Sequence, residues 1–230
     1  MVDMFIKQVD IEVSDLESAT SFFADVLEVP LRGERDRSVL TIGSSTLILT
    51  AGERKSGVHH LAFDIPPASF AAHRAWLEAK LPLLSSADGT TEFEGPPGWN
   101  SRSIYFSGPD QMVLELIARR ERPRPATRIP ELIAISEVGV AVADPLAAAR
   151  AVEAETGSGV LGSSSPEFVP VGDHDGLLIL VKDGRAWLPR FDVAAHILPL
   201  RISVATDGGN GERAFDSPIR FNSLAEAVAF

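Results

Sequence analysis

Three polar residues stand in segments whose other residues are mostly apolar, and their side chains could bind a metal. His60 and Gln8 each begin such a segment, and Glu115 lies inside a third. An imidazole and a carboxylate are suitable ligands for Zn, Fe, Ni or Mn, and an amide oxygen can complete the shell. If the three segments are neighbouring strands, Gln8, His60 and Glu115 form a candidate metal site.

Each of these residues also has a structural interpretation. His60 could be a core histidine held by hydrogen bonds, and Gln8 could serve only as a hydrogen-bonding group. Glu115 on a buried strand needs a metal, His60 or an arginine beside it, because an unpaired buried charge costs several kcal/mol. Side chains alternate along a strand, so three further carboxylates share the site face, as alternative ligands or as solvated residues: Asp10, Glu12 and Asp64.

The elements that would position these residues form a repeat of the order β-α-β-β-β. Ser14 and Glu17 have the spacing of a capping box before the first helix. Apolar periodicity predicts the first strand of each unit at 8–13, 60–65 and 137–142. It predicts the last strands at 46–50, 112–117 and 177–181, and the helices at 18–27, 70–80 and 146–155. A further strand is expected at 200–204, with an irregular tail after it.

Aligning the units gives equivalent positions. The first strands align at Gln8, His60 and Glu137, and the last strands align at Ile48, Glu115 and Ile179. Unit three then offers only Glu137 as a polar site residue. We therefore expect unit three to be a structural appendage or an interface.

The repeat also suggests how the chain divides. Residues 1–119 hold the two complete units, 120–132 form a linker, and 133–230 hold the third unit and the tail. Arg119, Arg120 and the prolines that follow make this linker basic. Such a run is typical of a solvated connector.

Composition excludes several classes of function. The chain has 230 residues with 45% hydrophobic residues, no cysteine and a net charge of −11. Disulfides and thiolate metal sites are therefore absent, and the negative charge argues against nucleic acid as a partner. The sequence has no apolar stretch of membrane-spanning length and no signal peptide, so a cytoplasmic location is the default expectation.

Several motifs together resemble the vicinal oxygen chelate superfamily, which includes glyoxalase I, the bleomycin-resistance proteins and the extradiol dioxygenases. The resemblance rests on the first strand and helix, on the opening of unit two and on the closing hairpin. The motifs are Val13-Ser14-Asp15-Leu16-Glu17, His60-Leu61-Ala62-Phe63, and Tyr105-Phe106 with Leu114-Glu115-Leu116. It covers residues 5–119 well and 133–183 more loosely.

The resemblance implies an α+β fold in which tandem βαβββ units form an open mixed-sheet barrel, with a third, partial βαβββ unit. Units one and two would enclose one divalent metal held by Gln8, His60 and Glu115, with Glu115 also catalytic. The chain departs from two patterns of the group. Gln8 stands where the dioxygenases have the first of two histidines, and Ile48 stands where glyoxalase I has a carboxylate.

Two functions follow as hypotheses. The first is a metal-dependent enzyme of the glyoxalase/dioxygenase type, an isomerase, lyase or ring-cleaving enzyme acting on a small oxygen-chelating substrate. The alternative is a metal-free small-molecule binding protein of the bleomycin-resistance type. In either case Tyr105, Trp99 and Asn100 are candidate ligand-binding residues. A homodimer is possible, and neither nucleic acid nor a membrane is an expected partner.

Overall fold

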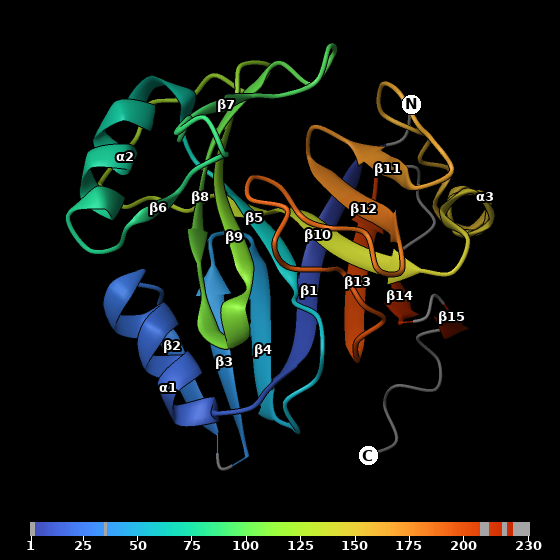
Figure 1. Ribbon diagram of the computed structural model, residues 1–230, viewed down its shortest axis with the longest axis horizontal. Coiled ribbons are helices and arrows are strands. Elements are labelled where there is room, and N and C mark those ends of the chain that lie inside the picture. Colours follow the sequence, from blue (N-terminus) through green and yellow to red (C-terminus); the bar gives the residue numbers. More distant parts are fainter. Residues whose placement is uncertain (1–2, 35, 208–211, 218–219, 223–230) are drawn as a thin grey trace.

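The computed structural model describes residues 3–34, 36–207, 212–217 and 220–222, and its strands form two mixed sheets. The seven-stranded sheet has the order β15-β14-β13-β1-β4-β3-β2, and the eight-stranded sheet the order β11-β12-β10-β5-β9-β8-β6, with β7 pairing beside β8 (Figure 1). Both sheets are open. The α+β architecture built from repeated βαβββ units is thereby confirmed.

The strands of the seven-stranded sheet come from both ends of the chain: β1 (Met4–Val13), β2 (Leu31–Glu34), β3 (Arg37–Ile42), β4 (Ser45–Ala51), β13 (Leu200–Thr206), β14 (Glu212–Asp216) and β15 (Arg220–Asn222). Those of the eight-stranded sheet come from the middle: β5 (His60–Asp64), β6 (Leu83–Leu84), β7 (Phe93–Glu94), β8 (Ser101–Ser107), β9 (Val113–Arg119), β10 (Ala134–Val142), β11 (Phe168–Asp173) and β12 (Gly176–Lys182). The tail predicted to be irregular after 200–204 thus contributes two more strands.

The helices lie outside the sheets, α1 and α2 at one end of the molecule and α3 at the other (Figure 1). They are α1 (Leu16–Ser21), which continues as the π-helical turn η1 (Phe22–Val26), α2 (Phe70–Glu78) after the 3-10 turn η2 (Pro67–Ser69), α3 (Pro145–Thr156), and the 3-10 turn η3 (Pro109–Gln111). None of the described helices has the length and apolar character needed to cross a membrane.

Helix starts follow local capping rules. Asp144 accepts a hydrogen bond from the Ala147 backbone N–H at 3.0 Å, and Pro145 follows it at the first helical position. In α1 the capping residue is Asp15, which accepts from the Ser18 N–H at 3.0 Å. Ser14 was predicted to cap this helix and does not. Its backbone N–H and hydroxyl donate instead to Asp110.

The pairing of the units differs from the sequence expectation. Units one and two do not share a sheet. Instead β5 of unit two pairs antiparallel with β10 of unit three, and β1 of unit one pairs antiparallel with β13 from the tail. Strand pairing therefore crosses the predicted division at 1–119, 120–132 and 133–230, and unit three supplies three strands of the eight-stranded sheet, β10, β11 and β12.

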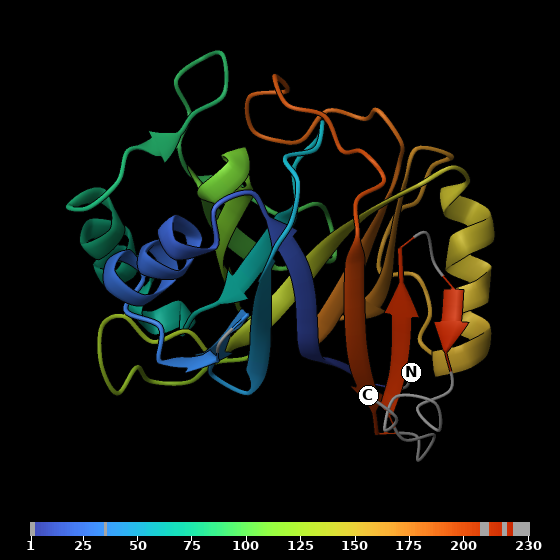
Figure 2. The same ribbon diagram turned by 90° about the horizontal axis from the view of Figure 1, so that it is seen from below.

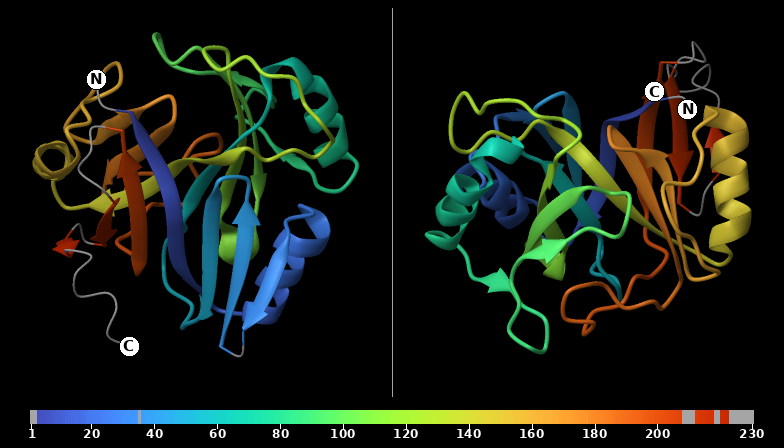
Figure 3. Two further views of the ribbon diagram at one scale, coloured as in Figure 1. Left: turned by 180° about the vertical axis from the view of Figure 1, so that it is seen from behind. Right: turned by 90° about the horizontal axis from the view of Figure 1, so that it is seen from above.

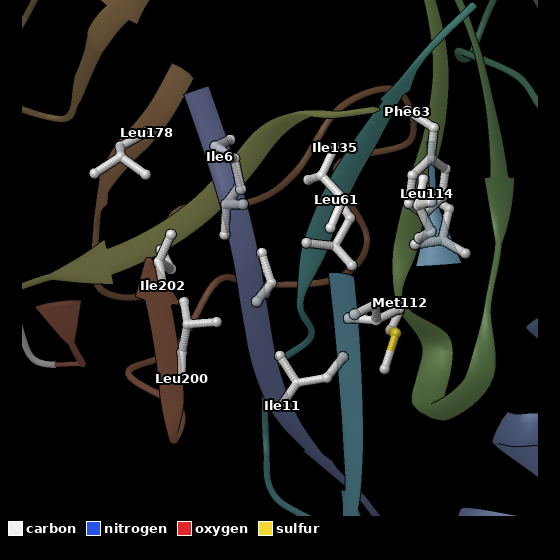
Figure 4. Packing of buried hydrophobic residues seen from close by; sticks show 14 of the residues in the cluster. Ile6, Ile11, Leu61, Phe63, Met112, Leu114, Ile135, Leu178, Leu200 and Ile202 are labelled. Carbon is white, nitrogen blue, oxygen red and sulfur yellow. The ribbon is translucent and has the colours of Figure 1, made fainter. Parts of the chain in front are cut away.

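The main core lies between the two sheets and under the helices (Figure 4). Ile6 and Ile11 of β1 face Leu61 of β5 and Leu178 of β12 across this core, and all four are at most 2% exposed. Burying such a side chain contributes about 1.5–3 kcal/mol. Because alternate residues of a strand point to opposite faces, the polar residues of β5, β9 and β10 are directed away from this core.

Candidate metal centre

Three ligand side chains converge on three adjacent strands of the eight-stranded sheet. Glu115 on β9 and Glu137 on β10 both pair with Ala62 of β5, one from each side, and His60 stands two residues earlier on the same strand. One ligand atom from each of His60, Glu115 and Glu137 lies within 4.8 Å of the other two, and all three residues are buried. The small Ala62 side chain leaves the space above it to the two carboxylates.

The His60 ring is held in the form that suits a ligand. Its Nδ1 lies 3.0 Å from the carbonyl oxygen of Val113, so Nδ1 carries the proton and donates it to that oxygen. Nε2 then keeps its lone pair and lies 3.6 Å from Oε2 of Glu115. Burial lowers the pKa of His60 to about 4, and the bond to Val113 offsets only part of this effect. The imidazole is therefore neutral at pH 7 and free to coordinate a cation through Nε2.

Glu115 and Glu137 are two buried carboxyl groups, and the cationic side chain that acts on both of them is that of Arg119. Burial, and after it the charge of Glu137, raises the pKa of Glu115 to about 8, although the Ser103 hydroxyl and Arg119 act in the opposite direction. Burial also raises the pKa of Glu137, and Arg119 lowers it. The charge of a bound divalent cation would oppose both upward shifts, because it stabilises the ionised carboxylates.

Arg119 is the cation that the linker interpretation assigned to solvent. Its side chain is fully buried, and its Nη2 donates to Oε1 of Glu137 while its Nε donates to the Ser136 hydroxyl at 3.0 Å. Its Nη1 has no partner among the described residues. Arg119 thus fixes one carboxylate oxygen of Glu137, and the other oxygen remains free to act as a ligand.

The cluster lies in a cavity of about 380 Å³ on the face of the sheet opposite the core. Aromatic side chains form its walls: Phe93, Trp99, Tyr105, Phe168 and Trp187. The Trp187 ring lies 4.9 Å from the His60 ring, centroid to centroid. Gly139 makes this contact possible, because a Cβ there would stand 2.5 Å from Cη2 of Trp187 and 2.9 Å from Cβ of His60.

Two loops enclose this cavity. One is the long loop that contains β7, which supplies Phe93 and Trp99, and the other is the segment 183–199 after β12, which supplies Trp187. The two loops rise on the same side of the molecule in two different views (Figures 2 and 3). The sheet therefore supplies the polar floor and two of the aromatic walls, Tyr105 of β8 and Phe168 of β11, and the loops supply the other three.

Among the predicted ligand-contacting residues, Tyr105 and Trp99 line the cavity. Asn100 does not belong to this lining. Its side chain amide donates to Glu121, and it lies at the base of the loop with a positive φ of 46°. Tyr105 stands directly opposite Glu115 across the β8–β9 pair, and burial raises its pKa well above 10, so its hydroxyl stays protonated.

Gln8 does not join His60 and Glu115. It lies on β1 in the other sheet, and its Nε2 donates to Oδ1 of Asp10 at 2.7 Å. Gln8 is separated from the other two because unit two pairs with unit three and not with unit one. This pairing brings Glu137 to the place that the predicted triad of Gln8, His60 and Glu115 gave to Gln8. The alternative carboxylates Asp10 and Glu12 are likewise on β1, and Asp64, on the cavity face of β5, is not one of the residues that line the cavity.

Strand register makes the correspondence of the two sheets explicit. Asp10 pairs with Ile48 on one side and with Arg201 on the other, just as Ala62 pairs with Glu115 and Glu137. Gln8 precedes Asp10 by two residues, as His60 precedes Ala62. The positions equivalent to the three candidate ligands in the seven-stranded sheet are thus Gln8, Ile48 and Arg201.

Sequence reasoning missed Glu137 as a candidate ligand and Arg119 as its partner, although both left a signal. The alignment of the units places Glu137 at the position of His60, but unit three was expected to be a structural appendage or an interface. Arg119 follows Glu115 by four residues in the same strand, so alternation places both on the same face. For Trp187, on a loop without periodicity, no such signal exists.

Comparison with known proteins identifies the fold and no close relative. No protein-family model matches the sequence, and no curated protein matches it. A putative dioxygenase from Bacillus subtilis matches with a TM-score of 0.58 and 17% identity over 78% of this chain, which spans only 64% of that chain. Glyoxalase I from Zea mays matches with a TM-score of 0.54 and 15% identity over 90% of this chain and 75% of that chain. The chain therefore has the vicinal oxygen chelate fold, as its motifs suggested.

Proposed function

We propose that this protein is a divalent-metal-dependent enzyme that acts on a small substrate with two adjacent oxygens, and that His60, Glu115 and Glu137 hold the metal. The observation that carries the proposal is the convergence of three buried ligand atoms within 4.8 Å at the floor of an aromatic cavity. The donor set fits such a cation, because one neutral imidazole and two carboxylates suit Mn, Fe, Ni or Zn. Burial, and after it the charge of Glu137, raises the pKa of Glu115, and the positive charge of a bound cation would oppose this rise.

When bound, the metal would supply Lewis acidity that polarises the substrate oxygens and stabilises an enolate or a similar anion. The protein groups orient the metal ligands and exclude water. The carbonyl of Val113 orients His60, Arg119 orients Glu137, and the aromatic walls keep water from the reacting centre. We assign to Glu115 the transfer of a substrate proton, since it lies at the cavity floor with the protonated Tyr105 opposite it.

Isomerase or lyase chemistry is favoured over ring cleavage. The ring-cleaving members of the superfamily that the motifs resemble use two histidines and one carboxylate, whereas this site offers one histidine and two carboxylates. The position equivalent to Glu115 in unit three is Ile179, which can supply no fourth ligand. One or more coordination positions would therefore stay open to substrate or water, which is the arrangement of catalytic rather than structural sites.

The test is metal uptake by protein that has been stripped with a chelator and dialysed against Mn²⁺, Fe²⁺, Ni²⁺ or Zn²⁺. We expect one ion per chain in the natural protein, and at least about a tenfold loss of affinity in Glu137→Gln and in His60→Ala. Glu94→Gln is the matched control, because Glu94 lies at the cavity rim and pairs with Arg120. Unchanged affinity in Glu137→Gln, or no uptake of any of these ions, would exclude this metal centre.

A metal-free binding protein is the second candidate, and one observation favours it. Without a metal the charges of the site already balance at neutral pH, because Arg119 pairs with Glu137 and the pKa of Glu115 is raised to about 8. This function predicts saturable binding of a small ligand in the presence of chelator, with no turnover after metal is added. A homodimer and a cytoplasmic location also remain predictions.

A further inference from the structure

The lining of the cavity includes a cationic group besides its acidic floor, the guanidinium of Arg185. Arg185, in the turn after β12, lines the cavity and is only partly exposed. Its guanidinium stacks over the Phe168 ring at 5.1 Å, which holds it in a defined position. Its one hydrogen bond is a long one of 3.3 Å from Nη1 to the carbonyl oxygen of the next residue. Arg185 thus keeps most of its donors for a partner.

No carboxylate in the described part of the chain takes those donors. Among the described residues Arg185 has no ion pair within 4 Å, and Glu167 is the charged group that acts on it from a longer distance. Glu94, the other charged group at the rim, receives two hydrogen bonds of 2.8 Å from Arg120. Glu137 on the floor is paired with Arg119. Arg185 is therefore the cavity cation that lacks a counter-ion.

The walls add a second requirement on the ligand. The same cavity is lined by several aromatic rings: Trp99 and Phe168 are 6.4 Å apart, centroid to centroid, and near-parallel, and Phe93 and Tyr105 lie edge to face at 5.4 Å. The indole Nε1 of Trp187 is buried without a hydrogen-bond acceptor, although the ring lines the cavity next to His60. A buried donor of this kind is satisfied when a ligand brings an oxygen to it.

We propose that the ligand of this cavity is a carboxylate with a planar, apolar ring. Its oxygenated end lies at His60 and Trp187, its ring lies between the aromatic walls, and its carboxylate binds Arg185. The guanidinium presents parallel donors that match the two oxygens of a carboxylate. This assignment deepens the proposed function, since it names the substrate class of the same cavity. The binding selectivity that it predicts holds with or without a metal.

The test is calorimetric titration with 3,4-dihydroxybenzoate and 3,4-dihydroxyphenylacetate, each compared with its methyl ester. The two acids place the carboxylate at two distances from the oxygenated end, and the esters remove the charge alone. At least one acid should bind about tenfold or more tightly than its ester, as expected for a charged hydrogen-bonded pair. Arg185→Gln should abolish this difference and leave ester binding unchanged. Arg190→Gln should keep the difference, because Arg190 lies on the same loop but pairs with Asp192.

Each titration is repeated in metal-loaded and in chelator-treated protein, which separates the two proposals. Arg185-dependent selectivity in both forms, without metal uptake, would support this ligand class and refute the metal centre. Equal binding of acid and ester, or an equal loss for both in Arg185→Gln, would overturn the inference even where metal is bound. A saturated analogue, cis-3,4-dihydroxycyclohexanecarboxylate, should bind at least about tenfold more weakly, and equal affinity would overturn the planar requirement.

Discussion

The buried pair of Arg119 and Glu137 supports a quantitative prediction about stability. The two side chains are 0% and 4% exposed, so removing either one leaves the other charge in the interior without its partner. Breaking a buried pair in this way costs about 3–5 kcal/mol. Arg119→Met loses in addition the bond from Nε to Ser136, which contributes about 1 kcal/mol. Glu137→Gln should therefore lose about 3–5 kcal/mol of unfolding free energy, and Arg119→Met about 4–6 kcal/mol.

The double variant should behave differently from the sum of the two. Replacing both charges by neutral side chains of similar size removes the uncompensated charge, so Arg119→Met/Glu137→Gln should return to within about 2 kcal/mol of the natural protein. The assay is urea unfolding followed by tryptophan fluorescence in the presence of chelator, with equal slopes required for the comparison. The exposed pair of Arg120 and Glu94 supplies the control, and its variants should change stability by less than about 1 kcal/mol.

Two results would refute this reasoning. Single variants no more costly than those of the control pair would mean that the guanidinium is solvated or replaceable. A double variant that loses the full sum of both single effects would mean that Arg119 and Glu137 act independently. In either case Arg119 would not be the group that orients Glu137 as a ligand.

Three further predictions concern other parts of the fold. Burial raises the pKa of Asp64 to about 6, so the folded carboxyl binds a proton that the unfolded one has released, and stability falls as pH rises from about 4 to about 6. Asp64→Asn should remove this loss and add up to about 3 kcal/mol at pH 7.5 but little at pH 4, measured by urea unfolding at both pH values; equal effects at the two pH values would contradict it. Gly139→Ala should displace Trp187 from His60, cost about 1–3 kcal/mol and shift tryptophan emission to the red; unchanged emission would show that the cavity adapts. A chain ending at Arg119 should show no cooperative unfolding, because β1 and β5 lose their partners β13 and β10; a sharp transition would mean that units one and two fold alone.

The local part of the fold could be predicted from the sequence. Alternation gave the strands, and aligning the units gave the correspondence of Gln8, His60 and Glu137 that the register reproduces. Such patterns report which face of a strand is buried, because burial of one face is a property of each strand by itself. The α+β class and the repeat followed from this information alone.

The pairing of the units could not be predicted in the same way. Every first strand has an apolar face and a free edge, so alternation is equally compatible with β5 beside β1 or beside β10. The choice depends on contacts between distant residues, such as those of β13 with β1, and the tail gave only one strand signal. The error over Gln8 followed directly from this choice, and so did the neglect of Glu137. Arg119 was misjudged because composition dominated its interpretation, although it shares a strand face with Glu115.

The seven-stranded sheet can be compared, position by position, with the candidate metal site of the eight-stranded sheet. At matched backbone positions it replaces an imidazole with the amide of Gln8, one carboxylate with the hydrocarbon of Ile48, and the other with the cation of Arg201. Arg201 lies 3.8 Å from Asp216, nitrogen to oxygen, and would repel a second positive ion. A duplicated framework therefore contains one set of candidate ligands, His60, Glu115 and Glu137, and one set of matched positions without them. Metal titrations should saturate at one equivalent per chain, and a second equivalent would have to be sought elsewhere in the protein.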